Sequence, residues 1–212
     1  MPKKYEFTTE TKTFFGRSLY RIRALIAFGD VEAGDLGGWI EKEENLAQEG
    51  NAWVYGDALV CDNARVCDNA WVYGDALVCD NARVCDNAWV YGDAWVYGDA
   101  LVFGDARVYG NARVYGNARV YGNARVCGNA RVCKSTHLLQ IGAIGSRDGF
   151  TTFARSKDKQ ILVACGCSRG TIDEFEAQVK KVHAGTKHEK TYLAAIKLAK
   201  LQIDDTEVKA DA

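Results

Sequence analysis

Five arginines in the second half of a repetitive stretch are spaced six residues apart, and a tyrosine follows three of them at the second position. A guanidinium group makes bidentate contacts with phosphate or carboxylate, and a tyrosine ring offers a stacking surface. Residues 106–134 contain these arginines and one lysine but no acidic residue, a net charge of +6. The pattern predicts a site for a nucleotide-like anion or an acidic protein segment. Its residues are Arg107, Arg113, Arg119, Arg125, Arg131, Tyr109, Tyr115 and Tyr121.

Two further arginines are candidates for holding a phosphate. Arg147 lies in the segment GSRDG, and Arg169 lies in CSRGT, just before an expected helix N-terminus. Such a terminus attracts anions through its free N–H groups and its dipole. Two ordinary turns and a helix cap explain the same residues more simply, and the phosphate clamp is the alternative.

Large aromatic residues recur every eighteen positions earlier in the stretch. If they share one face, they form an apolar area larger than a soluble monomer normally exposes. Tryptophan and tyrosine also dominate protein interfaces. We therefore expect a homo-oligomer, a dimer or trimer, although ring stacking that only stabilises the fold is the alternative. The expected interface comprises Trp53, Trp71, Trp89, Tyr55, Tyr73 and Tyr91.

Patterns for catalysis and metal binding are weak in comparison. Residues 51–134 contain no histidine, and the chain has no nucleophile triad, phosphate loop or dinucleotide-binding motif. Cys165 and Cys167 form a C-x-C pair without a second pair, which argues against zinc. The sequence therefore predicts no catalytic residue, no metal and no cofactor.

Fourteen consecutive hexapeptides, residues 51–134, must position these side chains. Each reads Asn/Asp, Ala, variable, Val, Tyr/Cys/Phe, Gly/Asp, except that Lys134 ends the last. Ala and Val lie two positions apart and so share the inward face of a strand, while the variable and Tyr/Cys/Phe residues point outward. The Gly/Asp–Asn/Asp pair predicts a turn. A strand and a corner repeated without hairpins or helices indicate a β-solenoid.

An internal duplication suggests the size of one coil. Residues 51–68 recur unchanged at 69–86, which favours three hexapeptides, or eighteen residues, per coil. The expected outward columns are Trp53, Trp71, Trp89, Arg107 and Arg125 on one face, Leu59, Leu77, Trp95, Arg113 and Arg131 on the next, and Arg65, Arg83, Leu101, Arg119 and His137 on the third.

Composition limits the choice of partners and compartment. The formal net charge is −1, which disfavours a nucleic-acid binder. The charge is unevenly distributed, because residues 51–105 carry a net charge of −7 and make that end of the array acidic. In the eighteen-residue register Cys61 lies under Cys79 and Cys67 under Cys85, close enough to bridge. Because the sequence shows no signal peptide or transmembrane stretch, we expect a reduced, cytoplasmic protein with no membrane partner.

Segments on either side of the array predict caps. Strand-like segments and a glycine-rich corner precede it, and a cap there covers the open edge of the first coil. After it, a hairpin, a helix with a Thr171 capping box and a second helix at about 189–203 are expected. The predicted parts are an N-terminal β cap at 1–38, a solenoid at 39–144, and a C-terminal α+β domain at 145–212 that ends in a tail at 204–212.

The array resembles the hexapeptide-repeat, left-handed parallel β-helix family, which implies a mostly β, triangular solenoid. The segments GDVEAGDLGGWIEKEENLAQEGNAWV and GSRDGFTTF…CGCSRGT, with the NARVYG units between them, are similar to phage and bacterial proteins described as hexapeptide-repeat transferases. The resemblance implies an acyltransferase using acyl-CoA as one possible activity. Such enzymes generally use a histidine base, often from a loop inserted in the coils. No hexapeptide here carries a loop, and the histidines are His137, His183 and His188.

The sequence thus favours a non-catalytic binding or scaffold protein. It would self-associate through solenoid faces and capture an anionic ligand or a protein target. The resemblance to phage proteins implies counter-defence or host interference in the host cytoplasm as its setting. An acyltransferase and a nucleic-acid-binding protein are the alternatives.

Overall fold

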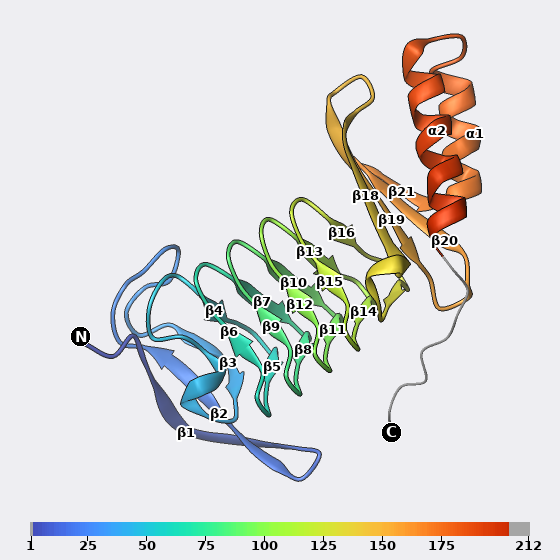
Figure 1. Ribbon diagram of the computed structural model, residues 1–212. Coiled ribbons are helices and arrows are strands. Elements are labelled where there is room, and N and C mark those ends of the chain that lie inside the picture. The colour runs from blue at the N-terminus through green and yellow to red at the C-terminus, as the bar shows by residue number, and fades with distance from the viewer. Residues whose placement is uncertain (1, 204–212) are drawn as a thin grey trace.

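A column of short parallel strands forms the body of the protein in the computed structural model, which describes residues 2–203 (Figure 1). A β-hairpin lies at the N-terminal end of the column, and a sheet with two helices lies at the other. Each strand pairs with the strand eighteen residues later, as Trp71 does with Trp89. This confirms the predicted left-handed parallel β-helix with three hexapeptides per coil. The expected tail at 204–212 lies outside the described residues.

The strands of the column form three faces, one for each position in the coil. The first face contains β4 (Trp53–Val54), β7 (Trp71–Gly74), β10 (Trp89–Gly92), β13 (Arg107–Tyr109) and β16 (Arg125–Val126). The second face contains β5 (Leu59–Val60), β8 (Leu77–Val78), β11 (Trp95–Val96), β14 (Arg113–Val114) and β17 (Arg131–Val132). The third face contains β6 (Arg65–Val66), β9 (Arg83–Val84), β12 (Leu101–Val102) and β15 (Arg119–Val120).

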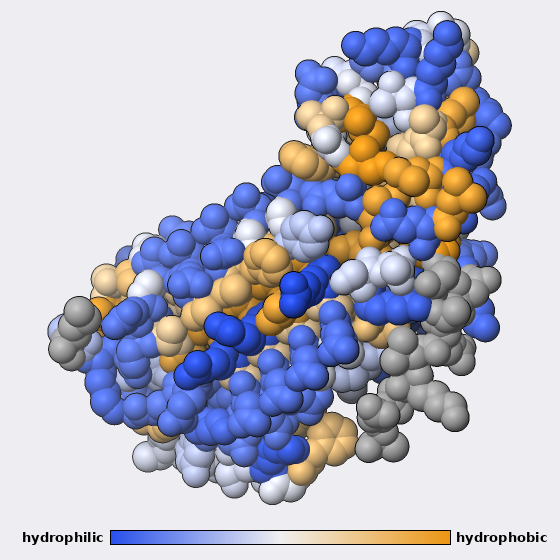
Figure 2. Space-filling model, in the orientation of Figure 1, coloured by the Kyte–Doolittle hydropathy of each residue, from blue (hydrophilic) through white to orange (hydrophobic). Residues whose placement is uncertain are grey.

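Alanine and valine fill the interior of the column, as the alternation predicted. Every alanine and valine of the hexapeptides is at most 1% exposed. Corners take left-handed backbone conformations, and at Gly74 (φ 75°) an added Cβ would lie 3.0 Å from the backbone nitrogen of Gly92. The small corner residue therefore lets successive coils stack closely. On the face seen in Figure 2, apolar side chains form a band along the column with hydrophilic ones on either side.

The N-terminal cap closes the first coil. Strands β1 (Tyr5–Phe14) and β2 (Arg17–Ala24) form an antiparallel hairpin, and β2 also pairs with β3 (Leu36–Ile40). Strand β3 then pairs in parallel with β5, so the hairpin continues the second face. A 3-10 turn, Glu43–Asn45, follows β3. On the second face, the strand edge of the first coil that could pair with another chain is thus covered.

The C-terminal module is a four-stranded antiparallel sheet with two helices. Its hairpin and both helices match the prediction, including the capping box in which Thr171 accepts from Glu174 N. Ile172, Phe175 and Val179 form the buried side of α1, whereas Val182, its last residue, is 63% exposed. The elements are β18 (Leu138–Ile144), β19 (Gly149–Arg155), β20 (Ile161–Cys165), β21 (Ser168–Thr171), α1 (Ile172–Val182) and α2 (Lys187–Gln202).

Parallel pairing ends earlier than the repeat pattern suggested. Strand β18 spans the last part of the expected solenoid but pairs antiparallel with β19. The 3-10 turn Ser135–His137 separates it from the last coil, because the hexapeptide at 135–140 lacks the Ala and Val of the inward face. Strand β19 covers the open edge of that coil, where Arg125 N donates to Thr152 Oγ1 at 3.0 Å. Within residues 2–203, neither helix combines the length and apolar character needed to cross a membrane.

Candidate anion-binding site

The five predicted arginines of the column are spread over its three faces. Arg107 pairs with Arg125 on the first face, and Arg113 pairs with Arg131 on the second. Arg119 lies on the third face beside a leucine. The structure therefore brings together two separate pairs and leaves one arginine apart, and a small ligand cannot contact all five.

Two of these arginines stack on tryptophans one coil away. The guanidinium carbon of Arg107 lies 4.9 Å from the ring centre of Trp89, and that of Arg113 lies 4.2 Å from the ring centre of Trp95. Cation–π contacts of this kind contribute about 0.5–1 kcal/mol at exposed sites. They position the guanidinium groups without neutralising their charge.

Arg131 is occupied by hydrogen bonds within the column. Its Nη1 donates to the backbone oxygens of Asn111 and Ala130, at 2.8 and 3.0 Å. Burial lowers the pKa of Arg131, and the neighbouring charge of Arg113 lowers it further. The pair on the second face is therefore a poorer anion site than the pair on the first.

On the first face, the arginine pair meets a third arginine from the C-terminal sheet. The Nη1 atoms of Arg125 and Arg169 both donate to the backbone oxygen of Gly166, at 2.9 and 2.7 Å. Arg169 Nε also donates to the hydroxyl of Tyr109 at 2.8 Å. Arg107 lies in register with Arg125 on the adjacent strand. We call Arg107, Arg125, Arg169 and Tyr109 the arginine junction.

Carboxylates do not balance the positive charge of the arginine junction. In the described part of the chain, none of its three arginines forms an ion pair with an aspartate or glutamate. Burial raises the pKa of Tyr109. Burial works to lower the pKa of Arg169, but the hydrogen bond to Tyr109, together with the electrostatic effects of Tyr109, Cys127 and Tyr91, outweighs it, and the pKa lies above its ordinary value. At neutral pH the tyrosine is neutral and the arginine is charged.

A cavity of about 260 Å³ adjoins the junction, between the C-terminal sheet and helices α1 and α2. Its wall includes Gly166, Cys167 and Ser168, the turn that the junction arginines hold, and also Arg147 and Tyr192. Burial raises the pKa of Tyr192 to about 12, and the neighbouring Cys165 adds to the shift. The cavity thus combines apolar walls, neutral polar groups and one arginine.

Arg147 and Arg169 do not form the phosphate clamp that the sequence suggested. Arg147 lines the cavity, whereas the side chain of Arg169 reaches across to the first face. The N-terminus of α1 is already capped, because Thr171 N donates to the carboxylate of Glu174 at 2.8 Å. That hydrogen bond lowers the pKa of Glu174. The structure at the start of α1 therefore fits the simpler interpretation, an ordinary turn followed by a helix cap.

The tryptophan column is only partly exposed, which corrects the predicted interface. Trp53 is fully buried, because its ring packs edge-on against Tyr5 and Phe28 of the N-terminal segment at 6.3 and 5.3 Å. Trp71 is half-buried, and Trp89 is 37% exposed. A second copy of the chain could thus reach Trp89 but not Trp53. The tyrosines of the predicted set, Tyr55, Tyr73 and Tyr91, all retain exposed surface.

Only one of the three predicted ligand-binding tyrosines lies at the junction. Tyr115 stacks on Tyr97 on the second face, with ring centres 5.0 Å apart. Tyr121 stacks on Phe103 on the third face at 5.5 Å. Tyr121 and Arg119 line a separate cavity of about 550 Å³ with residues of β18. These residues belong to other surfaces of the molecule.

The histidine nearest the array is buried, although the sequence places it in an outward slot. His137 is 0% exposed, and its Nδ1 lies 3.3 Å from Cys133 Sγ. The turn Ser135–His137 places it beside Cys133 at the end of the last coil. His183, in contrast, lines the cavity of the C-terminal module, where its ring centre lies 5.6 Å from that of Tyr192.

Sequence reasoning did not identify the Gly166 carbonyl or the cavity beside it. Every residue has a backbone oxygen, so the sequence does not indicate which one accepts hydrogen bonds from two arginines. The one local signal is the turn between Cys165 and Cys167, where Gly166 has a left-handed φ of 57°.

Comparisons with known proteins agree with the architecture. The YdcK beta solenoid repeat matches residues 64–80, 82–98, 106–122, 112–125 and 118–134. An Escherichia coli K12 protein named "Uncharacterized acetyltransferase YdcK" is 37% identical over 79 residues. The match covers 30% of this chain and 24% of that protein's length. The chain is therefore a repeat β-solenoid protein similar to YdcK along its coils, with no activity assigned by the similarity.

Proposed function

We propose that this protein is a non-catalytic binding protein whose arginine junction captures an anionic, nucleotide-like ligand. The observation that carries the proposal is the convergence of Arg125 and Arg169 on one carbonyl, with Arg107 alongside and no carboxylate partner among residues 2–203. Like charges held close together repel each other, and a bound anion relieves that repulsion.

The junction retains hydrogen-bond donors for such an anion. A guanidinium group has five N–H donors. Among residues 2–203, Arg125 makes one side-chain hydrogen bond and Arg169 makes three. The other donors suit bidentate contacts with phosphate, which arginine forms better than lysine.

The surroundings of the junction favour a ligand that carries an aromatic group. Tyr109 ends a series of stacked rings, with centres 4.9 Å apart from Tyr73 to Tyr91 and from Tyr91 to Tyr109. The cavity behind Gly166 offers apolar walls nearby. A nucleotide combines both features, whereas an acidic protein segment uses mainly the arginines. Capture of a nucleotide signal or a host protein suits the counter-defence setting that the sequence resemblance implies.

Titration calorimetry with ATP as the probe tests the proposal on the full chain. We expect saturable binding whose affinity falls steeply as salt rises, because charge carries most of the interaction. Mass spectrometry of ligands that co-purify with the native protein would identify the natural ligand. An absence of saturable binding to ATP, ADP and AMP at millimolar concentration would contradict the nucleotide proposal, and binding of an acidic peptide alone would replace it with a protein target.

The alternative of an acyltransferase using acyl-CoA rests on the name of the E. coli relative, which describes it as an acetyltransferase. The buried His137 is poorly placed to act as a general base, and His183 is the histidine that lines a cavity. We expect no thiol release from acetyl-CoA. Saturable acetyl-CoA binding with thiol release that disappears in His183→Ala would establish the alternative. Nucleic-acid binding is disfavoured by the net charge of −1.

We further propose that the protein self-associates through the exposed part of the first face. Trp89, in β10 of the first face, is 37% exposed, and Tyr55, which directly follows β4 of the same face, is 52% exposed. Light scattering at micromolar concentration should show an oligomer, and Trp89→Glu should reduce its mass. Tyr121→Glu is the matched control, because Tyr121 is an exposed ring on the third face. A monomeric wild type, or equal effects of the two variants, would contradict this interface.

A further inference from the structure

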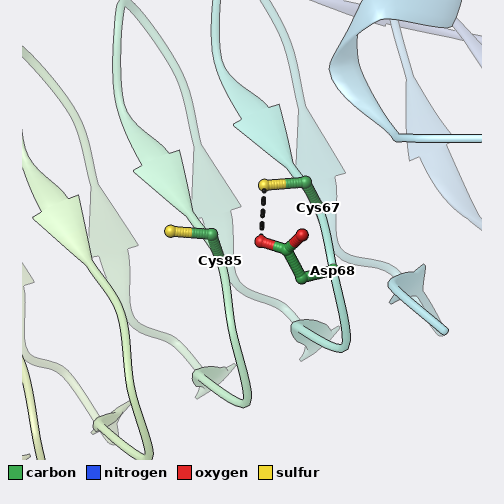
Figure 3. A group of neighbouring side chains, drawn as sticks. All are labelled: Cys67, Asp68 and Cys85. Atoms are coloured by element: carbon green, nitrogen blue, oxygen red, sulfur yellow. Dashed lines mark hydrogen bonds between the residues drawn. The ribbon is translucent and has the colours of Figure 1, made fainter. Parts of the chain in front are cut away.

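Cys67, Asp68 and Cys85 form a compact group at a corner of the third face (Figure 3). The two sulfur atoms and a carboxylate oxygen of Asp68 lie within 4.8 Å of one another. Figure 3 shows the thiols projecting in the same direction from successive coils, with the carboxylate between them. Cys67 Sγ donates to Asp68 Oδ2 at 3.3 Å. Three potential metal ligands are therefore gathered before any ion is present.

At several corners of the array, an aspartate directly follows a cysteine. The corner residue is glycine after every tyrosine or phenylalanine, but it is aspartate after four of the six cysteines. These aspartates have φ between 57° and 61°, a conformation that glycine adopts more easily. Asp68 Oδ2 accepts from Asp86 N at 3.2 Å, so the carboxylate also ties two coils together. The aspartates are Asp62, Asp68, Asp80 and Asp86.

A second group of similar composition is already neutralised. Asp62, Cys79 and Asp80 also place their ligand atoms within 4.8 Å of one another. However, Asp62 forms an ion pair with Arg17 of the N-terminal hairpin. Asp68 forms no ion pair among the described residues. The group at Cys67 is therefore the better cation site of the two.

We propose that Cys67, Asp68 and Cys85 bind a thiophilic divalent cation of the Zn²⁺ or Cd²⁺ class. A zinc ion with bonds to sulfur of about 2.3 Å in tetrahedral geometry needs sulfurs about 3.8 Å apart, which small side-chain rotations from the observed group provide. Two sulfurs and one oxygen leave a fourth position for water. Sulfur ligands select against Mg²⁺ and Ca²⁺, which prefer oxygen.

The surroundings of Cys67 and Cys85 determine whether their thiols are protonated before a metal binds. Burial raises the pKa of Cys67 to about 12, and Asp68 contributes. Burial also raises the pKa of Cys85, whereas the guanidinium of Arg83 lowers the pKa of both thiols. Both cysteines are thus neutral without a metal. Binding forms two metal–thiolate bonds and one metal–carboxylate bond, and the two thiol protons pass to solvent.

Titration of the reduced full chain with Cd²⁺ tests the proposal through the ultraviolet charge-transfer absorption of cadmium–thiolate bonds. A phosphine reductant keeps the eight cysteines free without adding thiol ligands. We expect one tight equivalent, displaced by Zn²⁺ but not by Mg²⁺. Cys67→Ser and Cys85→Ser should each abolish it, and Asp68→Asn should weaken it about tenfold or more, in the range found when a metal site loses a supporting group.

Matched controls separate this site from adventitious thiol binding. Cys127→Ser removes a half-buried cysteine from the same slot of another hexapeptide, where glycine follows it. Cys79→Ser removes a thiol of the second group. Both variants should keep the tight equivalent. The proposal is overturned if no tight equivalent exists, or if it survives in Cys67→Ser and Cys85→Ser. Circular dichroism checks each fold, and Asp68→Asn retains an oxygen acceptor for the coil contact.

Discussion

Replacing Trp53 with alanine should lower the free energy of unfolding by about 3–5 kcal/mol, the range for truncating a large buried ring. Trp53 is 0% exposed and packs against Tyr5 and Phe28. Its indole nitrogen has no hydrogen-bond partner among the described residues, so the loss comes from packing alone. The cavity would open where the N-terminal segment covers the first coil. Urea denaturation under reducing conditions measures the change.

Trp89→Ala is the control for this measurement. Trp89 occupies the same slot two coils away but is 37% exposed, and its ring contacts Arg107 and Tyr73. We expect it to cost about 1 kcal/mol, the scale of a partly exposed ring with one cation–π contact. Equal losses for the two variants would show that the N-terminal segment does not bury Trp53 in solution.

Reversing the charge of Arg107 and Arg125 together should weaken ATP binding by more than a hundredfold at low salt. The double variant Arg107→Glu/Arg125→Glu replaces two of the three guanidinium groups at the junction with carboxylates, which repel phosphate. Both side chains lie on the outside of the column, so its alanine and valine core is unchanged. Titration calorimetry measures the affinity, and the remaining binding should lose its salt dependence.

Arg65→Glu/Arg83→Glu is the matched control for the charge reversal. Arg65 and Arg83 are also stacked in register on adjacent coils, but they lie on the third face. This variant changes net charge equally and should bind ATP as the wild type does. Because Arg125 also holds Gly166, Arg107→Glu alone tests the charge without that contact. Normal ATP binding by the double variant would mean that the junction is purely structural.

The column could be predicted from the sequence because its structure is determined locally. Ala58 and Val60 lie two residues apart and share the interior, and every hexapeptide repeats that spacing. The duplication at 51–68 and 69–86 then indicated the register, which also aligned Arg107 with Arg125. The capping box at Thr171 was equally readable, since it depends on residues three positions apart.

What the sequence did not reveal depends on contacts between distant segments. Trp53 has an outward slot like Trp89, and only the fold of the N-terminal segment decides that it is buried. His137 likewise continues the repeat spacing, but it is buried in the turn that follows the last coil, beside Cys133. In the junction itself, Arg125 and Arg169 both donate to one backbone oxygen, and such a contact cannot be predicted from the types of the residues involved.

The unchanged duplication at 51–68 and 69–86 makes the column a spacer of adjustable length. A coil is one eighteen-residue block, and because its neighbours present the same backbone, a block can be added or removed without altering either end. Each block shifts the two terminal modules apart by about 4.8 Å, the distance between hydrogen-bonded strands. Adding or removing such a block would therefore change the reach of the molecule in fixed steps while leaving the arginine junction, at the C-terminal end, intact.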